Sequence, residues 1–117
     1  MTDGDRIVLL YCTAASVVEA EKVAEAVVGQ RLAACANIIP GMRSLYWWQG
    51  RLEKGEEAVL ILKTRASLAE AATEAVKAAH SYSVPCVLPL PVGQDGNADY
   101  LAWLLAETEP ESGPDRR

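Results

Sequence analysis

The side chains in this sequence that are best suited to hold a metal ion are three cysteines, Cys12, Cys35 and Cys86, and its one histidine, His80. Thiolate sulfur and imidazole nitrogen are ligands suited to copper(I) and zinc. The cysteines are odd in number, lie far apart and form no CxxC pair, so we expect free thiols instead of a disulfide framework. Metal chemistry is therefore open to this chain if its fold brings these residues together.

Other chemistries find less support. One histidine leaves little room for a Ser/His/Asp triad, and neither a GxSxG motif nor a Gly-rich phosphate loop occurs. The segment DGNADY (95–100) resembles the start of a calcium loop, but its sixth position is Tyr100 instead of glycine. The glutamates Glu53, Glu56 and Glu57 are interpreted as a solvated surface. We expect no enzyme, and an enzyme with an unrecognised site is the weakest alternative.

Composition and charge narrow the class of protein. The chain has 117 residues, half of them apolar, 23% charged and with a net charge of −5, which favours one soluble domain. Lysine and arginine are scattered, which argues against nucleic acid as a partner. The apolar runs are shorter than the roughly 20 residues that span a bilayer, and the acidic, polar beginning contains no signal segment. We expect a cytoplasmic protein with no membrane contact.

The first half of the chain predicts a strand followed by a helix. RIVLLYCT (6–13) is a short apolar run rich in strand formers. SVVE (16–19) matches a capping box, with Ser16 as the N-cap and Glu19 reaching back. Apolar residues then repeat at helical spacing until Gly29, which is placed to end the helix.

The second half repeats this arrangement. AVLILKT (58–64) predicts a strand, and SLAE (67–70) predicts a second capping box at the start of another helix. PCVLPLPV (85–92) is extended, and its prolines confine it to an edge or an irregular strand. A third helix is predicted over 97–107, with an asparagine as its N-cap.

A long β-rich arm, residues 31–59, joins the two halves. The Pro-Gly pair at 40–41 predicts a bend, and Gln-Gly at 49–50 predicts a hairpin turn. Trp47 and Trp48 are adjacent in this arm, so on a strand they point to opposite faces of the sheet. They cannot share one core, and the second tryptophan needs another surface to pack against.

The element order is β-α-β-β-α-β, the ferredoxin-like pattern of the α+β class, with an extra C-terminal helix. We expect one domain over residues 1–108 and a disordered polar tail over 109–117. Two helices cover only one face of a four-stranded sheet, yet the strands at 6–13 and 58–64 are nearly continuous apolar runs. The simplest way to bury the second face is to pack another copy of the chain against it. One tryptophan would then lie in a subunit interface; alternatively, Trp48 caps its own hairpin.

The expected strand order, 4-1-3-2, makes the first and last strands antiparallel neighbours. The end of the first strand then lies near the start of the last, which brings Cys12, His80 and Cys86 together as a candidate metal site. The alternative is that the cysteines are small buried apolar residues and the histidine belongs to a loop. A register shift of one residue would place the two thiols on different faces. Cys35 is assigned to packing or an interface.

Several separated segments resemble the CutA family, the divalent-cation tolerance proteins. They are ACANIIPGMRSLYWWQGRLEKGEEAVLILKT, HSYSVPCVLPLPV and GNADYLAWL, and with LLYCTA they span nearly the whole predicted fold in the family's order. The resemblance implies a PII-like homotrimer whose long arms interlock. That agrees with the uncovered sheet face inferred above.

The resemblance also implies binding of copper or other divalent metals. The family's proposed cysteine ligand corresponds to Cys12 and its histidine to His80. Where some relatives have a second histidine, this chain has Ala79, and Cys86 stands where relatives often carry a glutamate. Since a thiol is a softer ligand than a carboxylate, we expect a preference for softer metals, with copper or zinc ion as the bound species and no organic cofactor.

Two functional classes follow. The leading hypothesis is a cytosolic, non-enzymatic trimer that binds divalent or soft metal ions and contributes to metal tolerance. The alternative is a PII-like regulatory or scaffold module that receives a small molecule, such as an anion or a nucleotide, or a partner protein in a cleft between subunits. The residues proposed for an anion site in that case are Arg31, Arg43, Lys63 and Tyr82.

Overall fold

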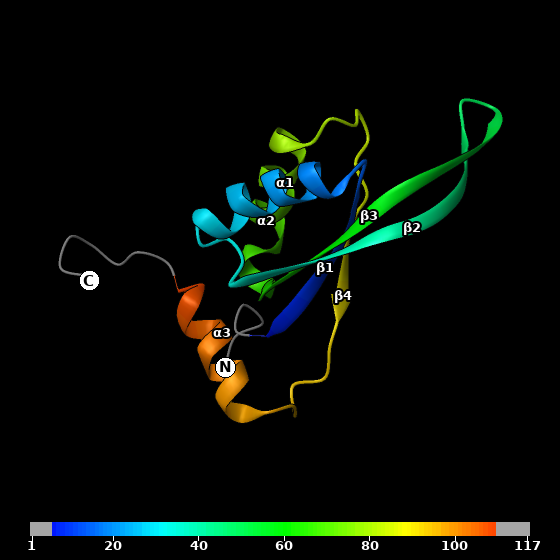
Figure 1. Cartoon of the computed structure of the whole chain (residues 1–117). Helices are drawn as coiled ribbons and strands as arrows, with labels where there is room; N and C mark the ends of the chain where they lie inside the picture. Colours follow the sequence, from blue (N-terminus) through cyan, green and yellow to red (C-terminus); the bar gives the residue numbers. More distant parts are fainter. Residues whose placement is uncertain (1–5, 110–117) are drawn as a thin grey trace.

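The computed structural model describes residues 6–109, and most of the predicted polar tail lies outside this range. Its elements follow the predicted β-α-β-β-α-β order with an added helix (Figure 1). They are β1 (Ile7–Ala14), α1 (Val17–Gly29), β2 (Cys35–Trp48), β3 (Arg51–Arg65), the 3-10 turn η2 (Ala66–Leu68), α2 (Ala69–Ala79), β4 (Val87–Pro91) and α3 (Ala98–Glu107). Within the described range, no helix combines the length and apolar character needed to cross a membrane.

The four strands form one antiparallel sheet in the order β2-β3-β1-β4. This is the predicted 4-1-3-2 order, so β1 is central and pairs with β4 as expected. Cys12 lies opposite Leu60 of β3 and Val87 of β4. The register therefore places the end of β1 beside the start of β4.

The caps of α1 follow the sequence closely. The Ser16 hydroxyl oxygen accepts a hydrogen bond from the Glu19 amide at 3.1 Å, as predicted. The Glu19 side chain also reaches back, but it accepts from the Ala15 amide at 2.9 Å, one residue before the N-cap. The first bond satisfies a backbone donor that an uncapped helix end leaves without a partner, and the second ties the residue ahead of the N-cap to the first turn.

The predicted capping box at 67–70 is wrong. Residues Ala66–Leu68 form a 3-10 turn, and α2 begins only at Ala69, with Leu68 at its N-cap and no side-chain cap. A 3-10 turn is a common way to enter an α-helix, because it satisfies early backbone groups without a side chain. The third helix behaves as predicted: the Asn97 side chain accepts from two backbone amides at the start of α3.

The core lies between one face of the sheet and the helices α1 and α2. Side chains of β1 alternate, and Leu10 and Cys12 point into this core with no exposed surface. Small residues on both helices let them approach the sheet and each other closely. The buried cluster consists of Leu10, Cys12, Ala14, Ala20, Val23, Ala24, Val27, Ala33, Ala58, Leu60, Leu62, Ala72 and Val76.

The opposite face of the sheet is only partly covered. Helix α3 packs at one end of it, where its Leu104 is buried (Figure 1). Beyond α3, Ile39, Leu88 and Leu90 are 50%, 56% and 42% exposed. Their alternation with core residues places them on this second face. The predicted third helix therefore leaves apolar sheet surface open in the single chain.

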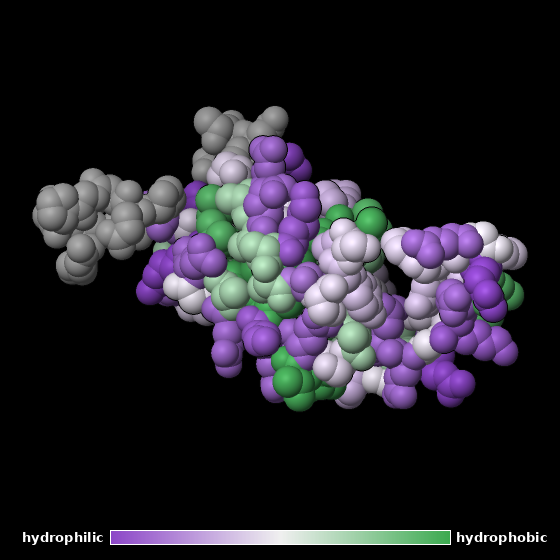
Figure 2. Space-filling view, turned by 90° about the horizontal axis from the view of Figure 1, so that it is seen from above, coloured by the Kyte–Doolittle hydropathy of each residue, from purple (hydrophilic) through white to green (hydrophobic). Residues whose placement is uncertain are grey.

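The hairpin of β2 and β3 extends beyond the helices as an arm, which projects from the body in Figure 2. Gln49 and Gly50 both have positive φ, 51° and 79°, as a two-residue type I′ turn requires. The predicted bend is a register shift between Ile39 and Met42. At the tip, both adjacent tryptophans retain exposed surface in the single chain.

Candidate functional site

The imidazole of His80 joins the segment after α2 to the end of β1. Its Nε2 lies 2.7 Å from the Thr13 carbonyl oxygen, and its Nδ1 lies 3.1 Å from the Tyr82 amide nitrogen. A backbone amide can only donate, so Nδ1 accepts from Tyr82 and the protonated Nε2 donates to the Thr13 carbonyl oxygen. The side chain is 1% exposed. Both ring nitrogens are thus committed to backbone groups.

Glu19 lies beside this histidine. Its Oε2 accepts from the Ser81 amide at 2.7 Å and lies 3.8 Å from His80 Nδ1. Burial by itself would raise the pKa of Glu19, but hydrogen bonds from Ser81 and Ala15 and the nearby histidine outweigh it, and the pKa is lowered. The carboxylate therefore stabilises the entry to α1 and the loop ahead of β4 together.

Cys12 belongs to the core. Burial, with a smaller electrostatic contribution from Cys86, raises the pKa of its thiol to about 12. Its sulfur lies 3.9 Å from the Leu10 carbonyl oxygen, a weak contact. Because metal ions bind the thiolate, Cys12 would have to lose its proton in an apolar environment before it could act as a ligand.

Cys86 is on the other side of the sheet. Its neighbour Val87 pairs with Cys12 and packs against the core, so Cys86 points to the opposite face, near Thr13. Burial and the Glu57 carboxylate raise the pKa of this thiol, and a hydrogen bond with Thr13 opposes them. Cys86 is half-buried and lines a surface pocket.

The sequence thus predicted the neighbourhood of these residues but not the directions of their side chains. Cys12, His80 and Cys86 lie where β1, β4 and their loop meet, yet the two thiols straddle the sheet. Among residues 6–109, no three histidine, cysteine, aspartate or glutamate side chains form a group that could hold a metal ion. The three predicted ligands fit a metal ion only after local rearrangement.

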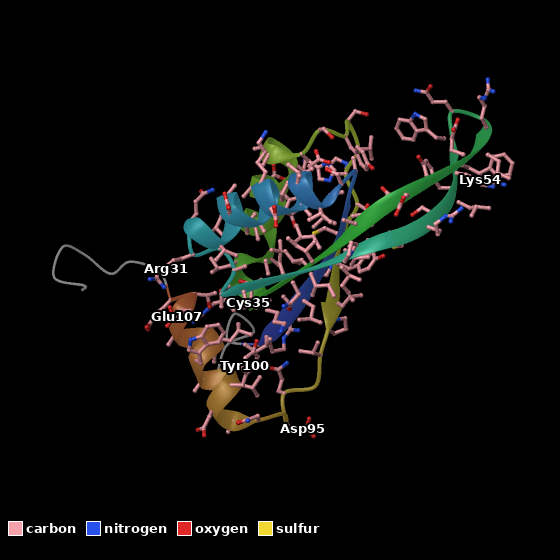
Figure 3. All side chains as sticks on the ribbon, in the orientation of Figure 1. Arg31, Cys35, Lys54, Asp95, Tyr100 and Glu107 are labelled. Carbon is pink, nitrogen blue, oxygen red and sulfur yellow. The ribbon has the colours of Figure 1, made fainter. Side chains whose placement is uncertain are left out.

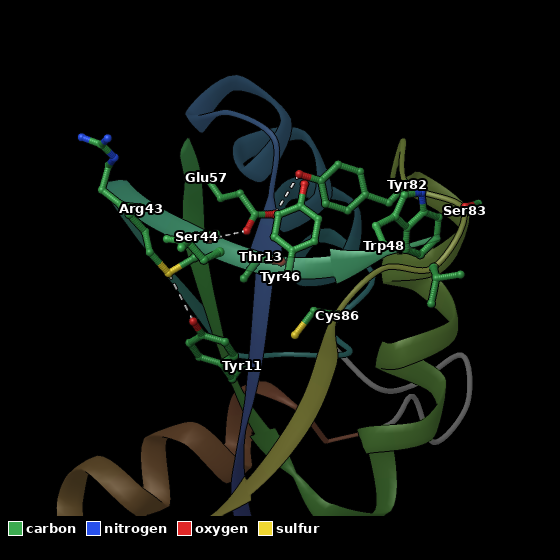
Figure 4. Close-up of a pocket in the computed structure, with 13 residues that line it drawn as sticks. Tyr11, Thr13, Arg43, Ser44, Tyr46, Trp48, Glu57, Tyr82, Ser83 and Cys86 are labelled. Carbon is green, nitrogen blue, oxygen red and sulfur yellow. Dashed lines mark hydrogen bonds between the residues drawn. The ribbon is translucent and has the colours of Figure 1, made fainter. Parts of the chain in front are cut away.

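A pocket of about 640 Å³ opens on the Cys86 side, between β1, the arm and the loop ahead of β4 (Figure 4). One lining group is the Glu57 carboxylate, which accepts hydrogen bonds from the Ser44 hydroxyl at 2.7 Å and the Tyr82 hydroxyl at 2.8 Å. We call it the Glu57 pocket. Its lining residues are Tyr11, Thr13, Met42, Arg43, Ser44, Leu45, Tyr46, Trp48, Glu57, Tyr82, Ser83, Val84 and Cys86.

Glu57 was missed by the sequence analysis, which placed it on a solvated surface. It is half-buried. Burial of the Tyr82 phenol, and then its hydrogen bond to the Glu57 carboxylate, raise the pKa of Tyr82, so this phenol keeps its proton. The available signal was periodicity: Glu57, Val59 and Ile61 alternate on the sheet face away from α1 and α2. An acid in register with apolar residues is an indication of a partly buried carboxylate.

The four residues proposed for an anion site do not meet. Arg31 pairs with Glu107 of α3 at 2.8 Å, and the Lys63 ammonium lies 3.1 Å from the Tyr100 hydroxyl. Figure 3 shows Arg31, Glu107 and Tyr100 at the α3 end of the molecule, far along the sheet from the arm. The other two, Arg43 and Tyr82, line the Glu57 pocket.

Comparison with known proteins places these features in a family. The family model described as CutA1 divalent ion tolerance protein matches residues 8–107. The divalent-cation tolerance protein CutA of Escherichia coli (strain K12 / DH10B) is 46% identical over 99 residues, which cover 85% of this chain and 88% of that protein. The chloroplastic protein CutA 1 of Oryza sativa subsp. japonica is 44% identical over 101 residues, or 86% of this chain. The chain spans about half the length of that plant relative, 56%.

Solved structures agree. The crystal structure of CutA1 from Oryza sativa superposes with a TM-score of 0.86 at 40% identity, covering 94% of this chain and 100% of that one. The periplasmic divalent cation tolerance protein CutA from Archaeoglobus fulgidus gives a TM-score of 0.83 at 37% identity, over 88% and 99% of the two chains. The chain belongs to the CutA1 divalent ion tolerance family.

Proposed function

We propose that this protein binds divalent or soft metal ions as a cytoplasmic, non-enzymatic homotrimer and thereby contributes to metal-ion tolerance. The observation that carries the proposal is the family match, which extends over residues 8–107 and so covers the elements of the fold except the first residue of β1. Relatives at more than 40% identity are named for divalent-cation tolerance. Copper and zinc are the metals we expect, because the available thiols are soft ligands.

The trimer is supported by surface that one chain leaves open. Apolar side chains of β2 and β4 remain about half exposed on the face away from α1 and α2. The arm exposes more apolar surface, including Leu45 and Leu52. Contiguous apolar surface of this kind is typical of protein interfaces. A PII-like trimer with interlocking arms would cover both regions.

The proposed ligands remain Cys12, His80 and Cys86, but they are not equivalent. Cys86 is half-buried and faces a pocket, so a metal ion can reach it directly. His80 would have to give up the hydrogen bond to Thr13, and Cys12 would have to ionise inside the core. We therefore expect Cys86 to contribute most to affinity.

Calorimetric titration of the reduced, assembled protein with copper(I) and with zinc tests this proposal. We expect saturable binding of about one metal ion per chain. Binding should be lost in Cys86→Ser and weakened in Cys12→Ser and His80→Ala, whereas Cys35→Ser, remote from the three, serves as the control. Weak binding that survives all three substitutions would overturn the proposed site, and absence of binding to the unmodified protein would overturn metal binding itself.

The Glu57 pocket supports a second candidate function, a PII-like module that binds a small molecule. At about 640 Å³ it lies within the range of ligand pockets, and it combines apolar walls with a few polar groups. Thermal stabilisation by small organic molecules, with no response to metal ions, would favour this function. Stabilisation by metal ions alone would exclude it.

A further inference from the structure

We propose that the arm of one subunit lies against the Glu57 pocket of the next, and that the partner subunit's Arg43 pairs with the Glu57 carboxylate. The inference rests on the homotrimer proposed above and specifies which surfaces of two copies meet. It does not depend on metal binding at Cys12, His80 and Cys86.

The arm has two faces that differ in charge. Residues directly opposite each other on β2 and β3 share a face, and successive pairs alternate between the two faces. The face that we call the Glu57 face has two acids and one cation, and consists of Met42, Ser44, Tyr46, Trp48, Arg51, Glu53, Gly55 and Glu57. The face that we call the Arg43 face has two cations and one acid, and consists of Arg43, Leu45, Trp47, Leu52, Lys54 and Glu56.

A ring of three identical chains needs two different surfaces on each chain. Each subunit meets one neighbour with one surface and the other neighbour with a second surface, because a three-fold axis makes the contact head-to-tail. Two Glu57 faces in contact would bring carboxylates of both chains together and would repel. Contact between a Glu57 face and the Arg43 face of the next chain joins opposite charges instead.

Glu57 is the charge that most needs a partner in such a contact. It accepts from two neutral hydroxyls, those of Ser44 and Tyr82, one on each carboxylate oxygen. Within residues 6–109 it forms no ion pair. The carboxylate is already half-buried, and a second copy over the pocket removes the water that still solvates it. A buried charge without a counter-charge is costly, so the covering chain has to supply a cation.

The remaining acceptor positions of Glu57 suit a guanidinium group. A carboxylate has about four acceptor positions, so one stays open on each oxygen after Ser44 and Tyr82 are bound. Two parallel N–H groups of an arginine match this pair of positions, whereas a lysine ammonium is a point charge.

Arg43 is the arginine in the right place. Its guanidinium is directed away from the Glu57 of its own chain (Figure 4), and within residues 6–109 it forms no ion pair. It lies on the face opposite to Glu57 and so faces outward for a neighbour. Arg51, in contrast, shares the Glu57 face and could reach a partner only if two faces of like charge met.

Apolar side chains accompany the charges on both faces. Leu45 follows Arg43 on its face and is exposed in the single chain, and Tyr46 and Trp48 are the corresponding apolar groups of the Glu57 face. Contact between the faces buries all three, which stabilises the assembly. Trp47 and Leu52 are nearer the tip of the arm, and we place them at the rim of the contact, where side chains contribute less.

Charge reversal tests the inference, by analytical ultracentrifugation of the full-length protein over a dilution series with a chelator present. Glu57→Arg sets two guanidinium groups against each other across the contact, and Arg43→Glu sets two carboxylates against each other. We expect each variant to dissociate at a protein concentration at least about tenfold higher than the unmodified trimer does.

Mixing the two variants separates a contact between chains from a contact within one chain. Where a Glu57→Arg chain meets an Arg43→Glu chain, the two introduced charges attract, and in the opposite order the two original residues meet. A ring of three always keeps one contact between like chains, so the mixture regains two contacts in three. We expect the mixture to form trimers at lower concentration than either variant alone. A pair within one chain would gain nothing from mixing.

The chain offers a matched control. Glu56 is the next residue on β3, is exposed and belongs to the Arg43 face. Glu56→Arg makes the same charge change as Glu57→Arg and should not weaken the trimer. Should Glu57→Arg fail to fold, Glu57→Gln replaces it: a mixture of Glu57→Gln with Arg43→Glu should associate more tightly than Arg43→Glu alone, because the amide removes the repulsion between carboxylates.

The outcomes separate this inference from the trimer on which it rests. An unmodified trimer whose dissociation is unchanged by both reversals, or a mixture that associates no better than its components, would overturn the inference and leave the trimer standing. An unmodified protein that forms no trimer at any concentration would reject the proposed assembly and this contact with it.

Discussion

His80 Nε2 lies 2.7 Å from the carbonyl oxygen of Thr13, so the histidine that the sequence offers as a metal ligand also holds the loop ahead of β4 against the end of β1. The second ring nitrogen accepts from the Tyr82 amide. Thr13 and Tyr82 both line the Glu57 pocket. His80 therefore positions one wall of that pocket whether or not it ever binds metal.

We predict that His80→Ala lowers the free energy of unfolding by about 1–3 kcal/mol, because the Thr13 carbonyl and the Tyr82 amide lose their partner. Urea denaturation in the presence of a chelator measures the change without any contribution from metal. Lys77→Ala, which removes an exposed side chain from α2, the helix just ahead of His80, should change stability little. Equal stability of the unmodified protein and His80→Ala would contradict the anchoring role.

Glu19 should make stability depend on pH. Its pKa is lower in the folded chain than in the unfolded chain, so its contribution is complete at neutral pH and is lost as the pH falls through the folded value, beginning near about pH 4–5. Glu19→Gln should therefore be less stable than the unmodified protein at neutral pH, and the difference should shrink in acid. Denaturation at several pH values measures this.

The control for that experiment is Glu21→Gln, an exposed position on the same helix. It should leave both the stability and its pH dependence close to those of the unmodified protein. A constant difference between Glu19→Gln and the unmodified protein at every pH would show that the effect of Glu19 is steric instead of electrostatic.

Cys86 should become more reactive when Glu57 is neutralised. The carboxylate helps to raise the pKa of the Cys86 thiol, so Glu57→Gln lowers that pKa and increases the thiolate fraction. In a Cys35→Ser background, we expect iodoacetamide to alkylate Cys86 several-fold faster in Glu57→Gln, followed by mass spectrometry. Cys12, fully buried with a pKa of about 12, should stay unlabelled until the chain unfolds. An unchanged Cys86 rate would show that burial alone controls its pKa.

The arm provides a test of assembly. Trp48 lines the Glu57 pocket and is 42% exposed, whereas Trp47 points to the other face and is 73% exposed. If another subunit covers Trp48, its truncation to alanine removes packing worth about 3–5 kcal/mol. We expect Trp48→Ala to elute as smaller species or to melt at a lower temperature, and Trp47→Ala to have less effect. An unchanged elution volume and melting point of Trp48→Ala would place it outside the interface.

Local patterns were sufficient for most of the fold. Apolar runs predicted β1 and β3, Ser16 and Asn97 predicted two helix starts, and the Gln49-Gly50 pair predicted the hairpin turn. Each of these depends on residues that are close in sequence. The capping box at 67–70 was the exception, because a 3-10 turn satisfied the same backbone groups.

The sequence by itself also determined that Cys12, near the end of β1, lies close to Cys86, just ahead of the neighbouring strand β4, because element order constrains which strands pair. Only the tertiary structure decided that their thiols lie on opposite faces, since side chains alternate and one residue of register reverses the direction. The partners of His80 and Glu57 are likewise far away in the chain: Thr13 is 67 residues from His80, and Tyr82 is 25 from Glu57. Whether a titratable side chain is free to bind a ligand depends on such distant partners, which no local pattern contains.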